Sequence, residues 1–194
     1  MGQDMGSKKE LNTSRVSSTP KIDGILDDEA WQNVDSETNF IELNPGDGTP
    51  EPATHKTEVK LIYDDEAIYI AAYMYDSDAS SILKQFSQRD NFDSQADFFL
   101  VSFNPFNDGI NETKFGVTAA GTLADTKSVN GDDDFTWSAV FVAKVSNDDK
   151  GWYAEFKIPY SALRFAKKDE QILGLQFYRE IKALNKTFTW NYVN

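Results

Sequence analysis

Residues 58–75 read EVKLIYDDEAIYIAAYMY, and this stretch decides the fold. Its first third alternates charged and apolar side chains, which is the two-residue period of a strand with one buried face. The acidic triplet at 64–66 has the composition of a hairpin turn. Residues 67–75 are apolar at positions of both parities. We therefore expect a central strand that is buried on one face and covered by aromatic side chains on the other.

Short segments of the same kind fill most of the chain. Residues 152–158, WYAEFKI, alternate most clearly, so the apolar side chains should face a core while Glu155 and Lys157 face solvent. This many short strands predicts an all-β fold, an antiparallel β-sandwich of the jelly-roll or immunoglobulin-like kind with about nine or ten strands. Further strands are expected at 97–103, 113–119, 123–129, 139–145, 172–180 and 187–192.

Helix is expected only as one or two short turns. Residues 26–31, LDDEAW, predict a capped turn that Trp31 fixes to the core, and 76–88 and 159–163 are the other places for a turn. Residues 1–18 are polar and aperiodic, which predicts a flexible leader, so the sandwich domain spans 19–194. The chain has no run of about 18 apolar residues, and we expect this domain not to insert into a membrane.

Composition excludes several classes of function. The chain has 194 residues, and its 32 acidic against 19 basic residues give a net charge of −13, which repels nucleic acids and anionic membranes. It has no cysteine, which excludes a disulfide framework and a thiolate metal site, and its one histidine, His55, makes a His-rich metal site or a His-based triad very hard to build. The sequence also lacks a glycine-rich phosphate loop and a nucleophile elbow. We therefore expect no enzyme activity.

Several segments, taken in order, resemble family 9 carbohydrate-binding modules. They are KIDGILDDEAW at 21–31, the hairpin at 59–70, GWYAEFKIP at 151–159 and LGLQF at 173–177. The resemblance covers nearly all of the chain from Pro20 to Tyr192. It implies a DOMON-like sandwich without catalysis, a saccharide or glycan as the partner, and a structural calcium ion.

Other segments are similar to a subgroup of these modules that precedes a predicted outer-membrane β-barrel of unknown function. They lie at 89–92, 106–109, 132–140 and 158–165. The subgroup implies an extracytoplasmic location, in the periplasm or at the cell surface, in association with the outer membrane. Two functions stay open. The domain is either a glycan-binding module of a cell-envelope protein, or a structural domain that docks onto its own chain's barrel or an envelope partner without binding sugar.

A sugar site needs a flat exposed ring, because the C–H face of a pyranose packs on an aromatic surface while polar neighbours bind its hydroxyls. Two tryptophans, Trp31 and Trp152, occupy alternating or turn positions that predict a place in the core. Trp137 has the same alternative, since strand aromatics usually pack inward. The candidate ligand-binding residues are Phe92, Trp137 and Trp190, with Arg89, Asp93 and Asp97 as hydrogen-bonding neighbours.

The run Asp132-Asp133-Asp134 is the candidate calcium site. Ca²⁺ takes six to eight oxygen ligands, commonly from carboxylates and loop carbonyls, and three adjacent carboxylates repel one another without a cation. The alternative is an acidic turn that is simply solvated. The acidic residues at 64–66 and 76–78 have the same two interpretations.

Overall fold

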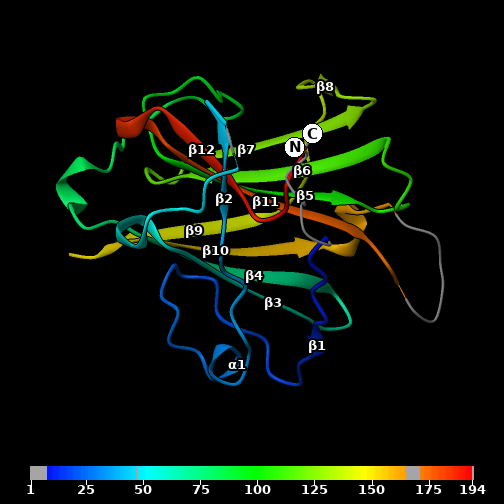
Figure 1. Cartoon of the computed structure of the whole chain (residues 1–194). Coiled ribbons are helices and arrows are strands. Elements are labelled where there is room, and N and C mark those ends of the chain that lie inside the picture. The colour runs from blue at the N-terminus through cyan, green and yellow to red at the C-terminus, as the bar shows by residue number, and fades with distance from the viewer. Residues whose placement is uncertain (1–7, 47, 165–170, 194) are drawn as a thin grey trace.

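The structure is a computed structural model that describes residues 8–46, 48–164 and 171–193. It is a sandwich of two packed sheets, which confirms the predicted fold class (Figure 1). The five-stranded sheet, here sheet A, has the order β1-β3-β4-β10-β9. The seven-stranded sheet, here sheet B, has the order β2-β12-β11-β5-β6-β7-β8.

Sheet A is built around the predicted hairpin. Its central strand β4 pairs antiparallel with β3 on one side and β10 on the other, and only β1 is parallel to its neighbour. Burial of β4 on both faces gives it the unbroken apolar run that the sequence shows. The strands are β1 (Ser14–Arg15), β3 (Thr57–Tyr63), β4 (Ala67–Tyr75), β9 (Val142–Asn147) and β10 (Gly151–Pro159).

Sheet B is antiparallel throughout and carries the longer loops. Two of its strands, β2 and β8, were not among those expected from the sequence, because β2 has only four residues and β8 consists of three aspartates. The strands are β2 (Ile41–Asn44), β5 (Phe98–Asn104), β6 (Asn111–Thr118), β7 (Leu123–Val129), β8 (Asp132–Asp134), β11 (Gly174–Ile181) and β12 (Lys186–Thr189).

The main core lies between the two sheets. Phe99 of β5 and Phe156 of β10 meet across it with 6.0 Å between ring centroids, and both are fully buried. Trp152 also belongs to this core, as predicted. Burial of an aromatic side chain stabilises the fold by about 2–3 kcal/mol. The facing aromatic rings therefore hold the two sheets together.

A second, smaller core covers the outer face of sheet A. The segment that contains α1 (Glu29–Gln32) lies below this sheet in Figure 1, and it brings Trp31 against Ile62, Tyr69 and Ala71. The expected helical turn is present, but the side chain of its N-cap residue Asp28 makes no capping hydrogen bond.

The second core explains an error in the predicted pattern of β10. Glu155 was expected to face solvent, but it is fully buried beneath the α1 segment. Its Oε1 accepts a 3.0 Å hydrogen bond from Nε1 of Trp31, and its Oε2 accepts bonds from the backbone N–H groups of Asp23 (3.0 Å) and Gly24 (2.8 Å). Burial raises the pKa of Glu155. The alternation of residues along a strand cannot show that a segment from elsewhere in the chain, here the one around Trp31, packs over the outward-facing side chain.

Part of the expected leader has a defined place. Ser14 and Arg15 form β1 beside β3, and the hydroxyl of Thr13 donates to the carbonyl of Leu61. Further back, the N–H of Lys9 donates a 2.7 Å bond to Oδ1 of Asn191, so the two ends of the described chain lie together. Within the described residues, no helix has the length and hydrophobicity needed to cross a bilayer.

Candidate functional site

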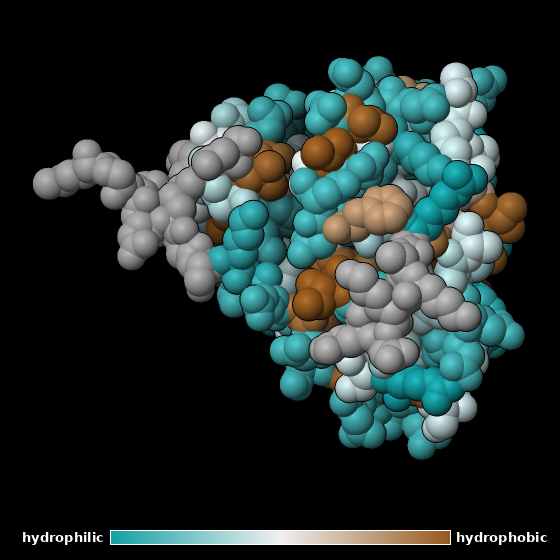
Figure 2. Space-filling view, turned by 90° about the vertical axis from the view of Figure 1, so that its right-hand side faces the viewer, coloured by the Kyte–Doolittle hydropathy of each residue, from teal (hydrophilic) through white to brown (hydrophobic). Residues whose placement is uncertain are grey.

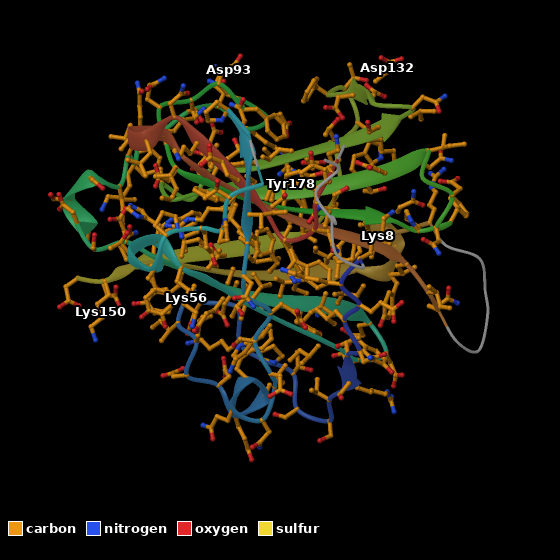
Figure 3. The ribbon with its side chains drawn as sticks, viewed as in Figure 1. Lys8, Lys56, Asp93, Asp132, Lys150 and Tyr178 are labelled. Carbon is orange, nitrogen blue, oxygen red and sulfur yellow. The ribbon has the colours of Figure 1, made fainter. Side chains whose placement is uncertain are left out.

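A groove of about 360 Å³ lies on the outer face of sheet B. Strand alternation sends every second side chain of this sheet away from the core. Figure 3 shows Asp93 and Asp132 on this outer side, with Tyr178 on the sheet between them. The groove is lined by Phe92, Phe98, Leu100, Lys114, Thr126, Asp133, Phe135, Tyr178, Glu180 and Thr187.

Three phenylalanines and Leu100 form the apolar part of the groove. Phe92 contacts Phe98 and Phe135 edge to face, with ring centroids 5.3 Å and 5.4 Å apart. Phe98 lies down on the sheet because its neighbour is Gly116, where an added Cβ would come within 2.2 Å of the Phe98 ring. Phe135 remains 50% exposed. The groove therefore has an aromatic floor and one exposed ring at its rim.

Charged and hydroxyl groups occupy the remaining lining. Nζ of Lys114 lies 2.8 Å from Oδ1 of Asp133, and Nζ of Lys182 lies 2.7 Å from Oε1 of Glu180. Burial, assisted by the nearby carboxylates of Glu112 and Asp133, raises the pKa of Tyr178 to about 12. The Tyr178 hydroxyl is therefore protonated at neutral pH and able to donate a hydrogen bond. Flat rings beside such donors and acceptors suit a ligand with one apolar face and several hydroxyls.

Two of the residues singled out from the sequence line this groove. Phe92 supplies part of the aromatic lining, and Asp133 supplies a carboxylate. Asp93 is exposed next to Phe92. The sequence reasoning missed Phe98, Phe135 and Tyr178. For Phe98 and Tyr178 the available signal was parity, because each sits next to a core phenylalanine, Phe99 or Phe177, on a strand that was correctly predicted.

The two later tryptophans do not offer a flat exposed ring. Trp190 is 2% exposed, packs on Phe177 in the core, and donates from Nε1 to Oε2 of Glu37 at 3.1 Å. Its indole therefore offers no exposed face on which a sugar could pack. Trp137 is half-buried against Phe115, and Nζ of Lys127 lies 4.4 Å from its ring centroid. The inward alternative thus describes Trp137.

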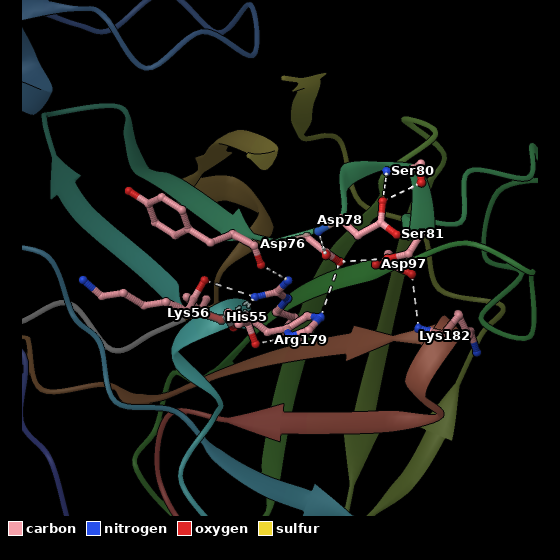
Figure 4. Close-up of polar contacts among 12 residues, drawn as sticks. His55, Lys56, Asp76, Asp78, Ser80, Ser81, Asp97, Arg179 and Lys182 are labelled. Atoms are coloured by element: carbon pink, nitrogen blue, oxygen red, sulfur yellow. Dashed lines mark hydrogen bonds and ion pairs between the residues drawn. The ribbon is translucent and has the colours of Figure 1, made fainter. Parts of the chain in front are cut away.

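Asp97 is also unavailable to a ligand, since it is 1% exposed at one end of the core. Its Oδ1 accepts a 3.1 Å bond from the backbone N–H of Lys182, and burial raises its pKa to about 6. Figure 4 shows Asp97 in a polar cluster with the buried Arg179. The Arg179 guanidinium donates to the carbonyls of His55 (2.6 Å) and Tyr75 (2.7 Å). This cluster links the two sheets, so its polar groups are structural.

Arg89 does not point a free guanidinium at the groove. It forms an ion pair with the buried Asp125 and donates to the carbonyl of Ala139 at 3.0 Å. Its guanidinium also lies 5.5 Å from the centre of the Phe141 ring. The guanidinium of Arg89 is therefore engaged by groups of the protein beside the groove and does not act as a hydrogen-bonding neighbour of a ligand.

The aspartates at 132–134 form β8, so successive side chains project from opposite faces and the three do not converge. Asp133 bonds to Lys114, and Oδ1 of Asp134 accepts from the N–H and the hydroxyl of Thr136. In the part of the chain that the structure describes, no three histidine or acidic side chains are grouped to hold a metal ion. The calcium site stays a prediction, and matched melting curves in EDTA and in calcium test it.

Comparisons with known proteins agree with this architecture. The family model described as carbohydrate family 9 binding domain-like matches residues 22–187. A family 9 module from Caldicellulosiruptor kristjanssonii, solved with cellotriose, is 20% identical with a TM-score of 0.63, over 92% of this chain and 82% of that one. Its glucose complex is 19% identical with a TM-score of 0.62, over 91% and 84%.

A protein from Bacteroides uniformis superposes with a TM-score of 0.73 at 15% identity, over 96% of this chain and 91% of its own. At these identities the structural matches show a shared fold. A search of curated proteins gave no match.

Proposed function

Because this chain belongs to the carbohydrate family 9 binding domain-like family, we propose that it is a non-catalytic module that binds a saccharide or glycan in the groove on sheet B. The observation that carries the proposal is the pairing of an exposed ring, Phe135, with hydrogen-bonding groups in one groove. The family 9 module from Caldicellulosiruptor kristjanssonii, which has a similar fold, was solved with cellotriose and with glucose. That likeness supports a saccharide as the first ligand to test.

The groove supplies both kinds of contact that a sugar needs. The C–H face of a pyranose packs on Phe135 or Phe92, while the hydroxyl of Tyr178 and the carboxylates of Asp133 and Glu180 bind its hydroxyl groups. The volume of about 360 Å³ lies at the lower end of the range for small-molecule sites. The groove therefore suits one or two sugar units better than a long stretch of polymer.

Charge favours an uncharged ligand. The protein carries a net charge of −13, and the acidic groups of the groove include Asp133 and Glu180. An anionic sugar such as a uronic acid would meet repulsion from both the groove and the whole surface. We expect neutral hexoses and their oligomers to bind more tightly than uronic-acid oligomers of equal length.

Calorimetric titration of the domain with glucose, cello-oligosaccharides and oligogalacturonate tests the proposal. Saturable binding of a neutral sugar, lost in Phe135→Ala, would support it. Absence of binding across these sugars and across a broad glycan array would overturn it. Incubation with the bound glycan should release no new reducing ends, because the groove carboxylates Asp133 and Glu180 are each held in an ion pair with a lysine.

Docking to an envelope partner is the second candidate function, and one surface favours it. Apolar side chains with exposures from 43% to 72% gather where β5, β7 and β11 approach the same end of sheet B. Figure 2 faces this end and shows hydrophobic side chains among hydrophilic ones. The residues are Phe106, Ile110, Val129 and Ile172.

The location belongs to the same proposal: a periplasmic or cell-surface domain joined to an outer-membrane β-barrel in its own chain. The support is the resemblance of residues 89–92 and 132–140 to the barrel-linked subgroup. Cell fractionation with protease accessibility would test the location. Recovery of the full-length protein in the cytosolic fraction would overturn it.

A further inference from the structure

We propose that Asp125 and Arg89 are positioning residues, which together set the spacing of Phe92 and Phe135 in the lining of the groove. The inference rests on the proposed function, because the spacing matters only if a ligand packs beside these two contacting rings. Asp125 lies on β7 and its side chain is fully buried, whereas Phe92 and Phe135 belong to two separate loops. Neither positioning residue lines the groove itself.

The Asp125 carboxylate holds both loops at once. Its Oδ2 accepts a 2.6 Å hydrogen bond from the N–H of Ala139, which lies four residues after Phe135. Its Oδ1 accepts from Nη2 of Arg89, which lies three residues before Phe92. A buried carboxylate requires partners for its oxygens, so this arrangement is strongly preferred over any in which one loop moves away.

The backbone of Asp125 makes its third connection, which goes to the loop that carries Phe92. Its N–H donates a 2.8 Å bond to Oδ1 of Asp90, and the N–H of Asp90 donates to the carbonyl of Leu123 at 3.1 Å. Asp90 has a φ of 65°, a left-handed conformation that aspartate tolerates better than most residues. The chain therefore turns at Asp90 and directs Phe92 toward the groove.

Arg89 joins the two loops directly. Its Nη2 donates both to Asp125 and to the carbonyl of Ala139, so one guanidinium bridges a strand and the second loop. From Ala139 back to Phe135 the second loop is short, and it is fixed by Trp137 against Phe115 and by Asp134 at Thr136. A displacement of Arg89 therefore changes the relative positions of both phenylalanines.

A coupling experiment tests this role. The variant Arg89→Met keeps an unbranched apolar side chain beside Phe141 but removes the guanidinium. We expect it to weaken binding of the neutral saccharide by about tenfold, within the range measured for residues that act on each other through contact. In a Phe92→Ala background the same substitution should have little further effect, because the pair of rings whose spacing Arg89 sets is already broken.

Arg15→Met is the control, since it removes the same guanidinium from an exposed ion pair with Asp65 at sheet A, on the far side of the sandwich from the groove. It should leave affinity unchanged. Asp125→Asn is the second variant, which keeps the shape of the side chain while removing its charge, and it should weaken binding in the same direction. A ligand-free readout is the NMR cross-peak between the Phe92 and Phe135 rings, which should weaken in Arg89→Met and persist in Arg15→Met.

The outcomes separate the two proposals. If the native protein binds no saccharide, the proposed function fails, and the ring cross-peak still decides whether Arg89 sets the ring spacing. Native-like affinity in Arg89→Met, or an equal loss with and without Phe92, would overturn the positioning role. An unchanged cross-peak in a folded Arg89→Met protein would overturn it as well.

Discussion

Trp31 and Glu155 are joined by a 3.0 Å hydrogen bond although 124 residues separate them in the sequence. The same carboxylate accepts from the backbone of Asp23 and Gly24, so it is the acceptor for three donors of the segment that covers sheet A. This arrangement makes Glu155 a structural carboxylate on the side of the sandwich opposite the groove. Its removal should affect stability and leave the groove intact.

We predict that Glu155→Ala lowers the free energy of unfolding by about 3 kcal/mol or more, because two buried donors and one half-buried donor lose their acceptor. Glu155→Gln keeps one acceptor oxygen and should lose less. Urea unfolding at neutral pH measures both. The control is Lys157→Ala on the same strand, whose ammonium makes an ion pair with the exposed Glu66 and should matter little. Equal stability of the Ala and Gln variants would contradict the role of the three donors.

Phe135→Ala should reduce saccharide affinity by about tenfold, since the stacking of a sugar on an aromatic ring would be lost. The melting temperature should hardly change, because the ring is 50% exposed. Phe106→Ala is the matched control: Phe106 is 55% exposed but lies outside the groove. Titration calorimetry on the three proteins gives the comparison, and a parallel loss in the control would refute the assignment of Phe135.

Asp97→Asn should alter how stability depends on pH. Burial raises the Asp97 pKa to about 6, above its ordinary value of 3.8, so the folded protein binds the proton more tightly than the unfolded chain. The stabilisation from the protonated form is therefore complete below pH 4 and is lost as pH rises through 6. Its upper limit is about 3 kcal/mol.

The variant lacks this titration, and its side-chain oxygen can still accept from the N–H of Lys182. Its stability relative to the native protein should therefore increase between pH 4.5 and pH 7.5. Chemical unfolding at several pH values measures this difference. A difference that is constant with pH would show that Asp97 does not titrate in this range.

Trp190→Phe should leave saccharide affinity unchanged and lower stability by about 1–3 kcal/mol. The indole is buried on Phe177, and its loss leaves a small cavity and removes the hydrogen bond to Glu37. Parallel calorimetry and thermal melts measure the two effects. A large loss of affinity at native stability would return Trp190 to the ligand site.

The fold could be predicted wherever its cause was local. Residues 67–75 and 123–129 were expected as strands and form β4 and β7 with these bounds. The expected strand at 139–145 begins later, at Val142, because the N–H of Ala139 bonds to Asp125 instead of to a neighbouring strand. Here the carboxylate of Asp125, 14 residues away, determines the backbone conformation at Ala139. The hydrophobic periodicity of the sequence contains no signal for such a contact.

The site was harder to predict, for the same reason. Phe92 and Asp133 were singled out from the sequence, but Phe135 joins them only through the loop that Asp125 holds. Whether an aromatic residue faces a core or a groove depends on which side of its sheet is covered. Trp190 shows the reverse case, since the neighbouring strands bury it completely enough to exclude a ligand.

The contact between Lys9 and Asn191 has a consequence for how such a domain can be combined with others. A polypeptide that enters at Lys9 leaves beside its point of entry, so the sandwich could be inserted into a surface loop of a host protein without stretching that loop. Two adjacent chain segments would then connect the domain to its host, and the domain with its groove would move relative to the host as a rigid unit.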